Sequence, residues 1–168
     1  IYLSGGTTNN AYYNTVYLNA ASTGALFGSA ALYASTTPTV NLIDNIFVNN
    51  STPVGATGFS SAYRRSSATL TSYANTSNNN LFYAGTPGIN NLIFYDGTNS
   101  DQTISAYKTR VASRDAASFT ENPSFVSTVG SNANFLHISN STPTQIESGG
   151  IPVAGITDDF DGNVRNAT

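Results

Sequence analysis

The acidic side chains are the residues of this sequence with the clearest capacity for chemistry. Cleavage of a sugar chain needs two carboxylates that act as general acid and base, or a carboxylate cluster that holds Ca²⁺. Before residue 158 the acids are widely spaced and form no evident pair; they are Asp44, Asp96, Asp101, Asp115, Glu121 and Glu147. We therefore expect no catalytic residues, and we do not expect an enzyme.

Two single residues each allow a functional and a structural interpretation. Asp44 directly precedes Asn45, and it either projects into a groove or caps a corner of the backbone, which is the commoner role. His137 stands between Leu136 and Ile138, so it faces outward if those two residues face inward. Because the sequence has no Cys and no second His, we assign His137 no role in a metal site or a catalytic triad.

The C-terminal tail carries the one candidate cofactor site, for Ca²⁺. Asp159, Asp161 and Asn163 alternate along the chain and Gly162 allows a tight turn, as in the first half of a calcium loop. The distal Glu that completes an EF-hand loop is missing. The alternative, which we prefer, is an Asp-Gly turn whose carboxylates accept hydrogen bonds from backbone amides and Arg165.

A repeated strand unit must position these residues. It is clearest at residues 40–50, where Asn45 precedes three large apolar residues, and it returns at Asn80, Asn91 and, more loosely, Asn134. Such units, separated by Gly, Ser, Thr and Asn, are typical of strands stacked along an axis, with roughly 20–25 residues in each rung. The alternative is an irregular antiparallel sandwich with Asn-rich turns.

The predicted fold is all-β, a parallel β-helix with one short helix near 103–112. Ser100 or Asp101 would cap the helix, which carries Ile104, Tyr107 and Val111 on one side. Corner asparagines in such a coil can pair their amides up the stack, and Asn45 and Asn80 are the candidates for this ladder. We expect one β-helix domain over 1–168, a mature or excised part of a larger secreted protein.

Two adjacent arginines provide a simple test of the strand prediction. Successive side chains of a strand point to opposite faces, so at most one of Arg64 and Arg65 can face the core.

The composition is polar but nearly uncharged. Hydrophobic residues make up 39% of the chain and charged residues only 9%, with a net charge of -3. No basic patch is available for nucleic acid, and no apolar run is long enough to span a membrane. We expect neither nucleic acid binding nor membrane insertion, and the many hydroxyl and amide side chains favour a secreted or cell-surface protein.

The C-terminal half resembles a known family. Arg114-Asp115-Ala116-Ala117-Ser118, followed by Asn122-Pro123-Ser124-Phe125-Val126, is similar to a segment near the end of secreted right-handed parallel β-helix proteins. Residues 158–165 look like their terminal Asp-hydrophobe-Asp-Gly-x-x-Arg motif. The wider pattern resembles β-helix surface proteins of the Bacteroidetes type, which usually carry a C-terminal sorting domain. This resemblance implies right-handed winding and a function among adhesins, structural surface proteins and carbohydrate-active enzymes.

The expected function is an extracellular structural or adhesive surface protein that assembles with copies of itself into a fibre or layer. A β-helix exposes unpaired strand edges at its ends, and sparse charge gives little repulsion between copies. Ile1, Tyr2 and Leu3 are the candidate strand donor for assembly. The alternative is a carbohydrate-binding or carbohydrate-cleaving β-helix, similar to a polysaccharide lyase or hydrolase. Its sugar-stacking candidates would be Tyr12, Tyr13, Tyr63, Tyr73 and Tyr95.

Overall fold

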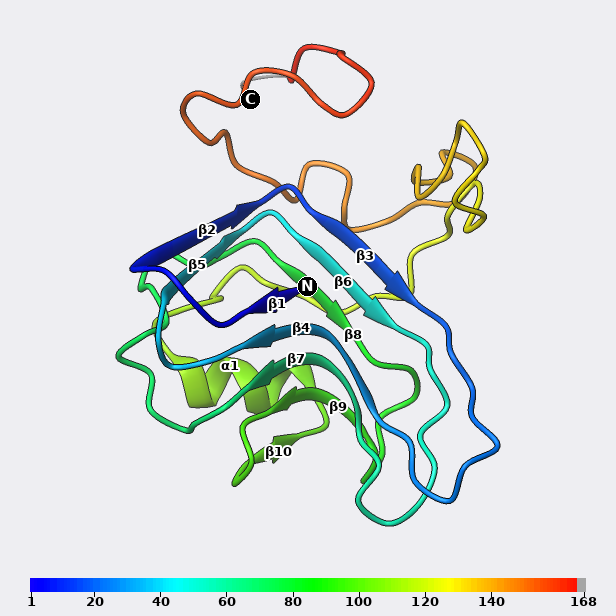
Figure 1. The fold of residues 1–168 in the computed structure, drawn as a ribbon. Coiled ribbons are helices and arrows are strands. Elements are labelled where there is room, and N and C mark those ends of the chain that lie inside the picture. Colours follow the sequence, from blue (N-terminus) through cyan, green and yellow to red (C-terminus); the bar gives the residue numbers. More distant parts are fainter. Residues whose placement is uncertain (166–168) are drawn as a thin grey trace.

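The computed structural model describes residues 1–165 as a parallel β-solenoid of about three turns, in agreement with the predicted fold class (Figure 1). Its strands form three sheets. Sheet A contains β1 (Tyr2–Leu3), β4 (Ser29–Ala34), β7 (Ser60–Arg65), β9 (Asn91–Tyr95) and β10 (Ser100–Asp101). Sheet B contains β2 (Thr8–Tyr12) and β5 (Thr39–Ile43), and sheet C contains β3 (Thr15–Leu18), β6 (Ile46–Asn49) and β8 (Leu81–Tyr83). All pairs are parallel except β9 with β10.

Each rung is longer than the predicted 20–25 residues. Asn14 contacts Asn45 across 31 residues, and Asn45 contacts Asn80 across 35. The prediction was wrong because the repeated motif occurs on more than one side of the coil. Asn80 precedes β8 in sheet C, Asn91 begins β9 in sheet A, and Asn134 lies outside the strands.

Inward-facing side chains form columns through the core. In sheet A, Leu32 pairs in register with Tyr63 and Tyr63 with Phe94, and all three side chains are fully buried. Phe47 and Phe82 stack beside them from sheet C, with ring centroids 5.8 Å apart. Each such buried side chain contributes about 1.5–3 kcal/mol. Aromatic and aliphatic residues at inward positions therefore hold neighbouring rungs together.

The arginine pair in β7 follows strand alternation. Arg64 is exposed and Arg65 is buried, so the prediction that at most one faces the core is confirmed. The buried guanidinium donates to the Tyr63 hydroxyl, the Thr69 carbonyl and the Ser72 hydroxyl, each at 3.0 Å. Arg65 thus occupies an inward position at the end of β7, and its guanidinium binds the segment that follows this strand.

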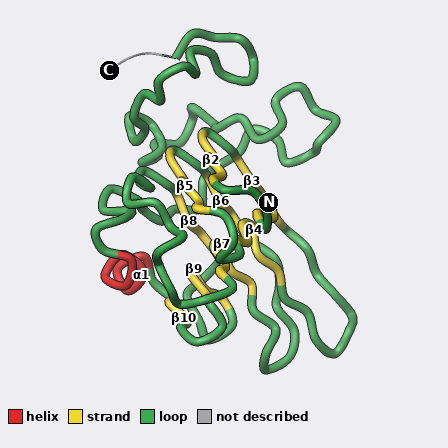
Figure 2. The backbone as a smooth tube through the Cα atoms, turned by 60° about the vertical axis from the view of Figure 1, so that its left-hand side comes forward, coloured by secondary structure: helices red, strands yellow, loops and turns green. Residues whose placement is uncertain are grey.

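Helix α1 (Ile104–Val111) covers the C-terminal end of the coil (Figures 1 and 2). Its buried Tyr107 ring lies 5.2 Å from Phe82 and 5.3 Å from Phe94, between ring centroids. The predicted cap was wrong. Thr103 accepts the Ala106 N–H at 3.3 Å, whereas Ser100 and Asp101 form β10. They pair with β9 because the chain makes a hairpin before the helix begins.

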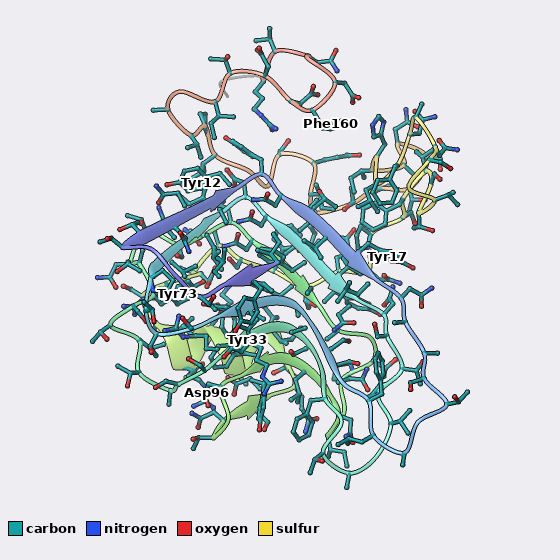
Figure 3. The ribbon with its side chains drawn as sticks, in the orientation of Figure 1. Tyr12, Tyr17, Tyr33, Tyr73, Asp96 and Phe160 are labelled. Atoms are coloured by element: carbon teal, nitrogen blue, oxygen red, sulfur yellow. The ribbon has the colours of Figure 1, made fainter. Side chains whose placement is uncertain are left out.

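Directly after α1 the chain stays in the coil, where Phe119 forms a parallel bridge with Leu81 of β8, and the following residues pass over the outside of the coil. Phe125 packs edge-on against Tyr17 of β3, with ring centroids 5.6 Å apart. The strand predicted near 135–138 is reduced to isolated bridges, including Phe125 with Ile138. The last described part, residues 145–165, is called the tail below. It crosses the corner between sheets B and C and ends in a loop where Phe160 is 98% exposed (Figures 1 and 3).

Candidate functional site

A ladder of asparagine side chains runs through the corner between sheets B and C. The Asn45 Oδ1 atom accepts the Asn14 backbone N–H at 3.0 Å and the Asn14 side-chain amide at 2.9 Å. The Asn80 Oδ1 atom accepts the same two groups of Asn45 at the same two distances. Each of these Oδ1 atoms thus accepts the backbone N–H and the side-chain amide of the asparagine one rung earlier. The two asparagines selected from the sequence are joined here by hydrogen bonds.

Sequence reasoning missed the first member of this ladder. Asn14 precedes Thr15-Val16-Tyr17-Leu18 just as Asn45 precedes Ile46-Phe47-Val48, so alignment at a spacing of 31 residues would have found it.

Asp115 terminates the ladder at its C-terminal end. This fully buried carboxylate accepts the Asn80 side-chain amide at 3.0 Å, the Ser118 hydroxyl at 2.6 Å and the hydroxyls of Tyr73 and Tyr107. Burial raises the pKa of Asp115, although these donors act in the opposite direction. No cation pairs with Asp115 within 4 Å in residues 1–165. Asp115 and Ser118 lie in the segment that resembles the β-helix family, and both accept hydrogen bonds from Asn80, the last asparagine of the ladder.

The opposite end of the coil is the first rung, formed by β1, β2 and β3. Each of these strands is the end strand of its sheet, so one edge of each has no partner strand within the described chain. The three residues expected to take part in assembly lie here. Ile1 and Tyr2 are exposed, whereas Leu3 packs against the core. β1 is the shortest edge and pairs with β4 at Tyr33 and Ala34.

An outward column on sheet A begins in the same rung. Tyr2, Tyr33, Arg64 and Tyr95 share one register across β1, β4, β7 and β9. The Tyr2 and Tyr33 rings stack 4.8 Å apart with an interplanar angle of 5°. The Arg64 guanidinium lies 5.9 Å from the Tyr33 ring centre and 5.4 Å from that of Tyr95. The column is therefore held together by stacking and cation–π contacts along the coil axis.

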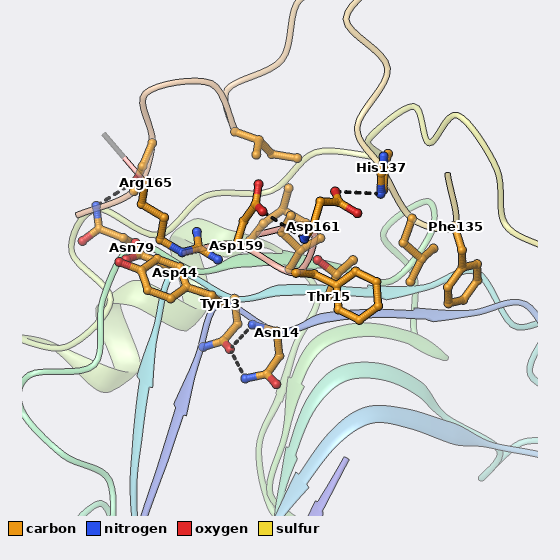
Figure 4. Close-up of a pocket in the computed structure, with 18 of the residues that line it drawn as sticks. Tyr13, Asn14, Thr15, Asp44, Asn79, Phe135, His137, Asp159, Asp161 and Arg165 are labelled. Carbon is orange, nitrogen blue, oxygen red and sulfur yellow. Dashed lines mark hydrogen bonds and ion pairs between the residues drawn. The ribbon is translucent and has the colours of Figure 1, made fainter. Parts of the chain in front are cut away.

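The tail and the corners enclose a cleft of about 580 Å³, which includes Asp44, Asp159 and Asp161 among its lining residues (Figure 4). Sequence spacing did not predict that these acids would meet. Each of these three carboxylates already has a partner. Asp44 accepts the Ile151 N–H at 3.1 and 3.2 Å, and Asp161 lies 3.2 Å from the His137 Nε2 atom.

Asp44 and Tyr13 fasten the tail to the corner. The Tyr13 hydroxyl donates to the Ile151 carbonyl at 2.7 Å and accepts the Val153 N–H at 2.9 Å. The Arg165 guanidinium lies 3.8 Å from the centre of the Tyr13 ring (Figure 4). Burial raises the pKa of Asp44 to about 6, opposed by the Ile151 amide and the charge of Arg165. Asp44 therefore holds backbone from the tail.

The calcium candidates form a turn closed by its own hydrogen bonds. The Asp159 carboxylate accepts the Asp161 and Asn163 backbone amides at 2.9 and 2.8 Å, and the Asn163 side-chain amide at 3.3 Å. Hydrogen bonding, chiefly from the Asn163 amide, lowers the pKa of Asp159. In this conformation Asp159 faces amide donors and Asp161 faces His137, an arrangement that does not converge on one cation. Calcium binding by a rearranged turn stays a prediction.

The tyrosines considered for sugar stacking separate into different environments. Tyr63 and Tyr73 are buried in the core and offer no ring to a ligand. Tyr13 is engaged by the tail, and the Tyr12 hydroxyl accepts a hydrogen bond from Asn41 at 2.8 Å. Tyr95 remains on the outer face, beside Arg64.

No protein family model, curated protein or solved structure matches this chain. The family resemblance therefore rests on the sequence motifs, and its confirmed part is the parallel β-solenoid. Within residues 1–165, no cluster of three or more His, Asp or Glu residues is placed to hold a metal ion. The described part of the chain also contains no helix long and apolar enough to cross a membrane.

Proposed function

We propose that this protein is an extracellular structural and adhesive module that associates with copies of itself through its first rung. The observation that carries the proposal is the difference between the two ends of the coil. Within residues 1–165 the first rung has one unpaired strand edge in all three sheets, whereas at the other end α1 packs over the core and β9 is paired with the antiparallel β10.

A free strand edge attracts further strands because its N–H and C=O groups are half unpaired. Soluble proteins usually protect such edges with charged residues, proline or a covering segment. β1, β2 and β3 contain no charged side chain and no proline. The net charge of -3 over 168 residues adds little repulsion between copies. Unpaired backbone groups therefore favour association at this edge, and electrostatic repulsion between copies opposes it only weakly.

A second candidate function, binding of an acidic glycan, is supported by Arg64. This exposed guanidinium has no ion-pair partner within the described residues and is held between Tyr33 and Tyr95. Its free edge could bind a sugar carboxylate in a bidentate manner. However, both faces of the Tyr33 ring are covered, by Tyr2 and by Arg64, which leaves less ring surface for sugar stacking. Self-association is therefore the stronger proposal.

Sedimentation velocity and negative-stain electron microscopy over a concentration series test the proposal. The full chain should form concentration-dependent oligomers or fibres, and a variant lacking Ile1, Tyr2 and Leu3 should lose them. Ile89→Ser is the matched control, because it removes an apolar side chain that is 78% exposed and lies just before β9, three strands away from β1 in sheet A. A full chain that stays monomeric at all concentrations would contradict the proposal, as would equal loss of association in the control.

The glycan candidate has a separate test. Binding to polygalacturonate should be lost in Arg64→Ala and retained in Arg165→Ala, if Arg64 recognises the carboxylates. Binding that is unchanged in Arg64→Ala would exclude this site.

A further inference from the structure

The asparagine ladder has a direction. Each step passes side-chain amide hydrogens from an earlier rung to the Oδ1 atom of the following rung, first from Asn14 to Asn45 and then from Asn45 to Asn80. The final step delivers an Asn80 amide hydrogen to Asp115. Donors therefore point toward the C-terminal end of the coil, and acceptors point toward the first rung.

The two ends of the ladder are consequently different. At the C-terminal end, Asp115 is an acceptor that already receives four donors, so it passes no amide hydrogen onward. At the first rung, the Asn14 amide hydrogens go to the Tyr12 carbonyl at 3.0 Å and to Asn45 at 2.9 Å. The Asn14 Oδ1 atom accepts no hydrogen bond from residues 1–165. The open position is thus an acceptor that an asparagine one rung earlier would satisfy.

The tyrosine column ends in the same way. Tyr33 has Tyr2 on one side and Arg64 on the other, but within residues 1–165 the Tyr2 ring is stacked on one side only, and Tyr2 is 70% exposed. A further rung with an aromatic residue in this register would cover the free face of Tyr2. Two independent columns therefore end with unfilled positions at the same edge.

These ends restrict how copies can associate. Two first rungs related by a twofold axis would bring two Asn14 acceptors together with no hydrogen between them. The C-terminal end of another copy offers the filled acceptor Asp115 and is covered by α1. The matching partner is a parallel rung with an amide donor and an aromatic residue at the right spacing, and residues 1–20 have both, in Asn14 and Tyr2.

We propose that the first rung binds residues 1–20 of a second copy in parallel register, after those residues leave their own solenoid. This inference rests on the proposed self-association. Along the coil axis the first rung pairs with the second rung only, and it continues into residues 19–26, which are exposed apart from Ser22. Its release also breaks the contacts of Tyr13 with the tail and of Tyr17 with Phe125. The donor copy then exposes its own second rung, where Asn45 and Tyr33 occupy the same columns. The released rung forms on the second copy the same kinds of hydrogen bond and ring stacking that it made in its own solenoid, so the exchange can repeat head to tail.

A synthetic peptide of residues 1–20 tests this register directly. Fluorescence anisotropy with the full chain should show saturable one-to-one binding. The peptide substitution Asn14→Asp removes the amide hydrogens and sets a carboxylate against the Asn14 acceptor, so affinity should fall at least about tenfold. Asn10→Asp makes the same charge change at an exposed position and should leave affinity within about twofold.

Disulfide formation then distinguishes addition of a rung from displacement of the first rung. The chain has no native cysteine, so introduced ones are unique. Parallel strands lie about 4.8 Å apart, within reach of a disulfide. A Tyr2→Cys peptide should cross-link to the Tyr2→Cys protein and not to the Tyr33→Cys protein. Cross-linking to the latter alone would show displacement and overturn the inference.

Two other results would also overturn it, namely absence of peptide binding and equal weakening by Asn10→Asp. If the full chain nevertheless self-associates in sedimentation, the proposed function stands and only the parallel exchange is wrong.

Discussion

Truncation of Asp115 to alanine should strongly destabilise the protein. The carboxylate receives hydrogen bonds from Asn80, Ser118, Tyr73 and Tyr107, and none of these donors is near bulk water. The two tyrosine hydroxyls lie 3.1 Å apart and can still satisfy one another in part. At least two donors are then left unpaired, at about 1–3 kcal/mol each, so the free energy of unfolding should fall by about 3–5 kcal/mol.

Asp115→Asn separates the shape of this residue from its charge. The amide keeps one acceptor for the ladder, and the tyrosine hydroxyls can turn to accept from its N–H groups. The cost at neutral pH should therefore be much smaller, about 0–2 kcal/mol. Burial raises the pKa of Asp115, so the folded state binds the proton more tightly than the unfolded state. The wild-type chain should accordingly lose stability as pH rises through this raised pKa, and Asp115→Asn should reduce that loss.

Urea unfolding measures both effects. The chain has ten tyrosines and no tryptophan, so tyrosine fluorescence and far-ultraviolet circular dichroism are suitable signals. Glu147→Ala, at an exposed carboxylate, is the control and should change stability by less than about 0.5 kcal/mol. An Asp115→Ala variant within about 1 kcal/mol of wild type would refute the view that this carboxylate anchors the ladder.

Three further perturbations test other parts of the structure. Burial raises the pKa of Asp44 to about 6 against the opposing effects of the Ile151 amide and Arg165, so this structure binds the proton more tightly than one in which Asp44 is exposed. The tail should therefore be better protected from hydrogen exchange at pH 5 than at pH 8, after correction for intrinsic rates, and Asp44→Asn should remove the difference. Asn45→Ala breaks a buried rung of the ladder and should cost about 2–4 kcal/mol in urea unfolding, whereas the exposed Asn140→Ala should cost almost nothing. Gly58→Ala would press a methyl group against two backbone carbonyls and should lower thermal stability by about 2 kcal/mol or more. Gly130→Ala is the control, because a methyl group there meets open space. Equal melting temperatures for these two variants would contradict the close packing around Gly58.

The strand repeat and the corner asparagines could be predicted from the sequence because they depend on local rules. Alternation places Arg64 outside and Arg65 inside, and an asparagine at the start of an apolar strand occupies the same corner in successive rungs. The length of a rung could not be obtained in this way. Asn80 and Asn91 carry similar motifs on different sides of the coil, and only the pairing of strands shows which copies lie above one another.

The sequence by itself determined the class of fold, the polar and weakly charged surface, and the corner positions of Asn45 and Asn80. The tertiary structure alone decided which end of the coil is covered, where the ladder stops at Asp115, and how the tail meets the corners. Tyr13 and the Ile151 carbonyl are 138 residues apart in the sequence, and no local propensity connects them. Neighbouring rungs repeat the same motif at similar spacings, 31 and 35 residues, and so leave a signal in the sequence, whereas a cap or a docked tail is formed once, by long-range packing that leaves none.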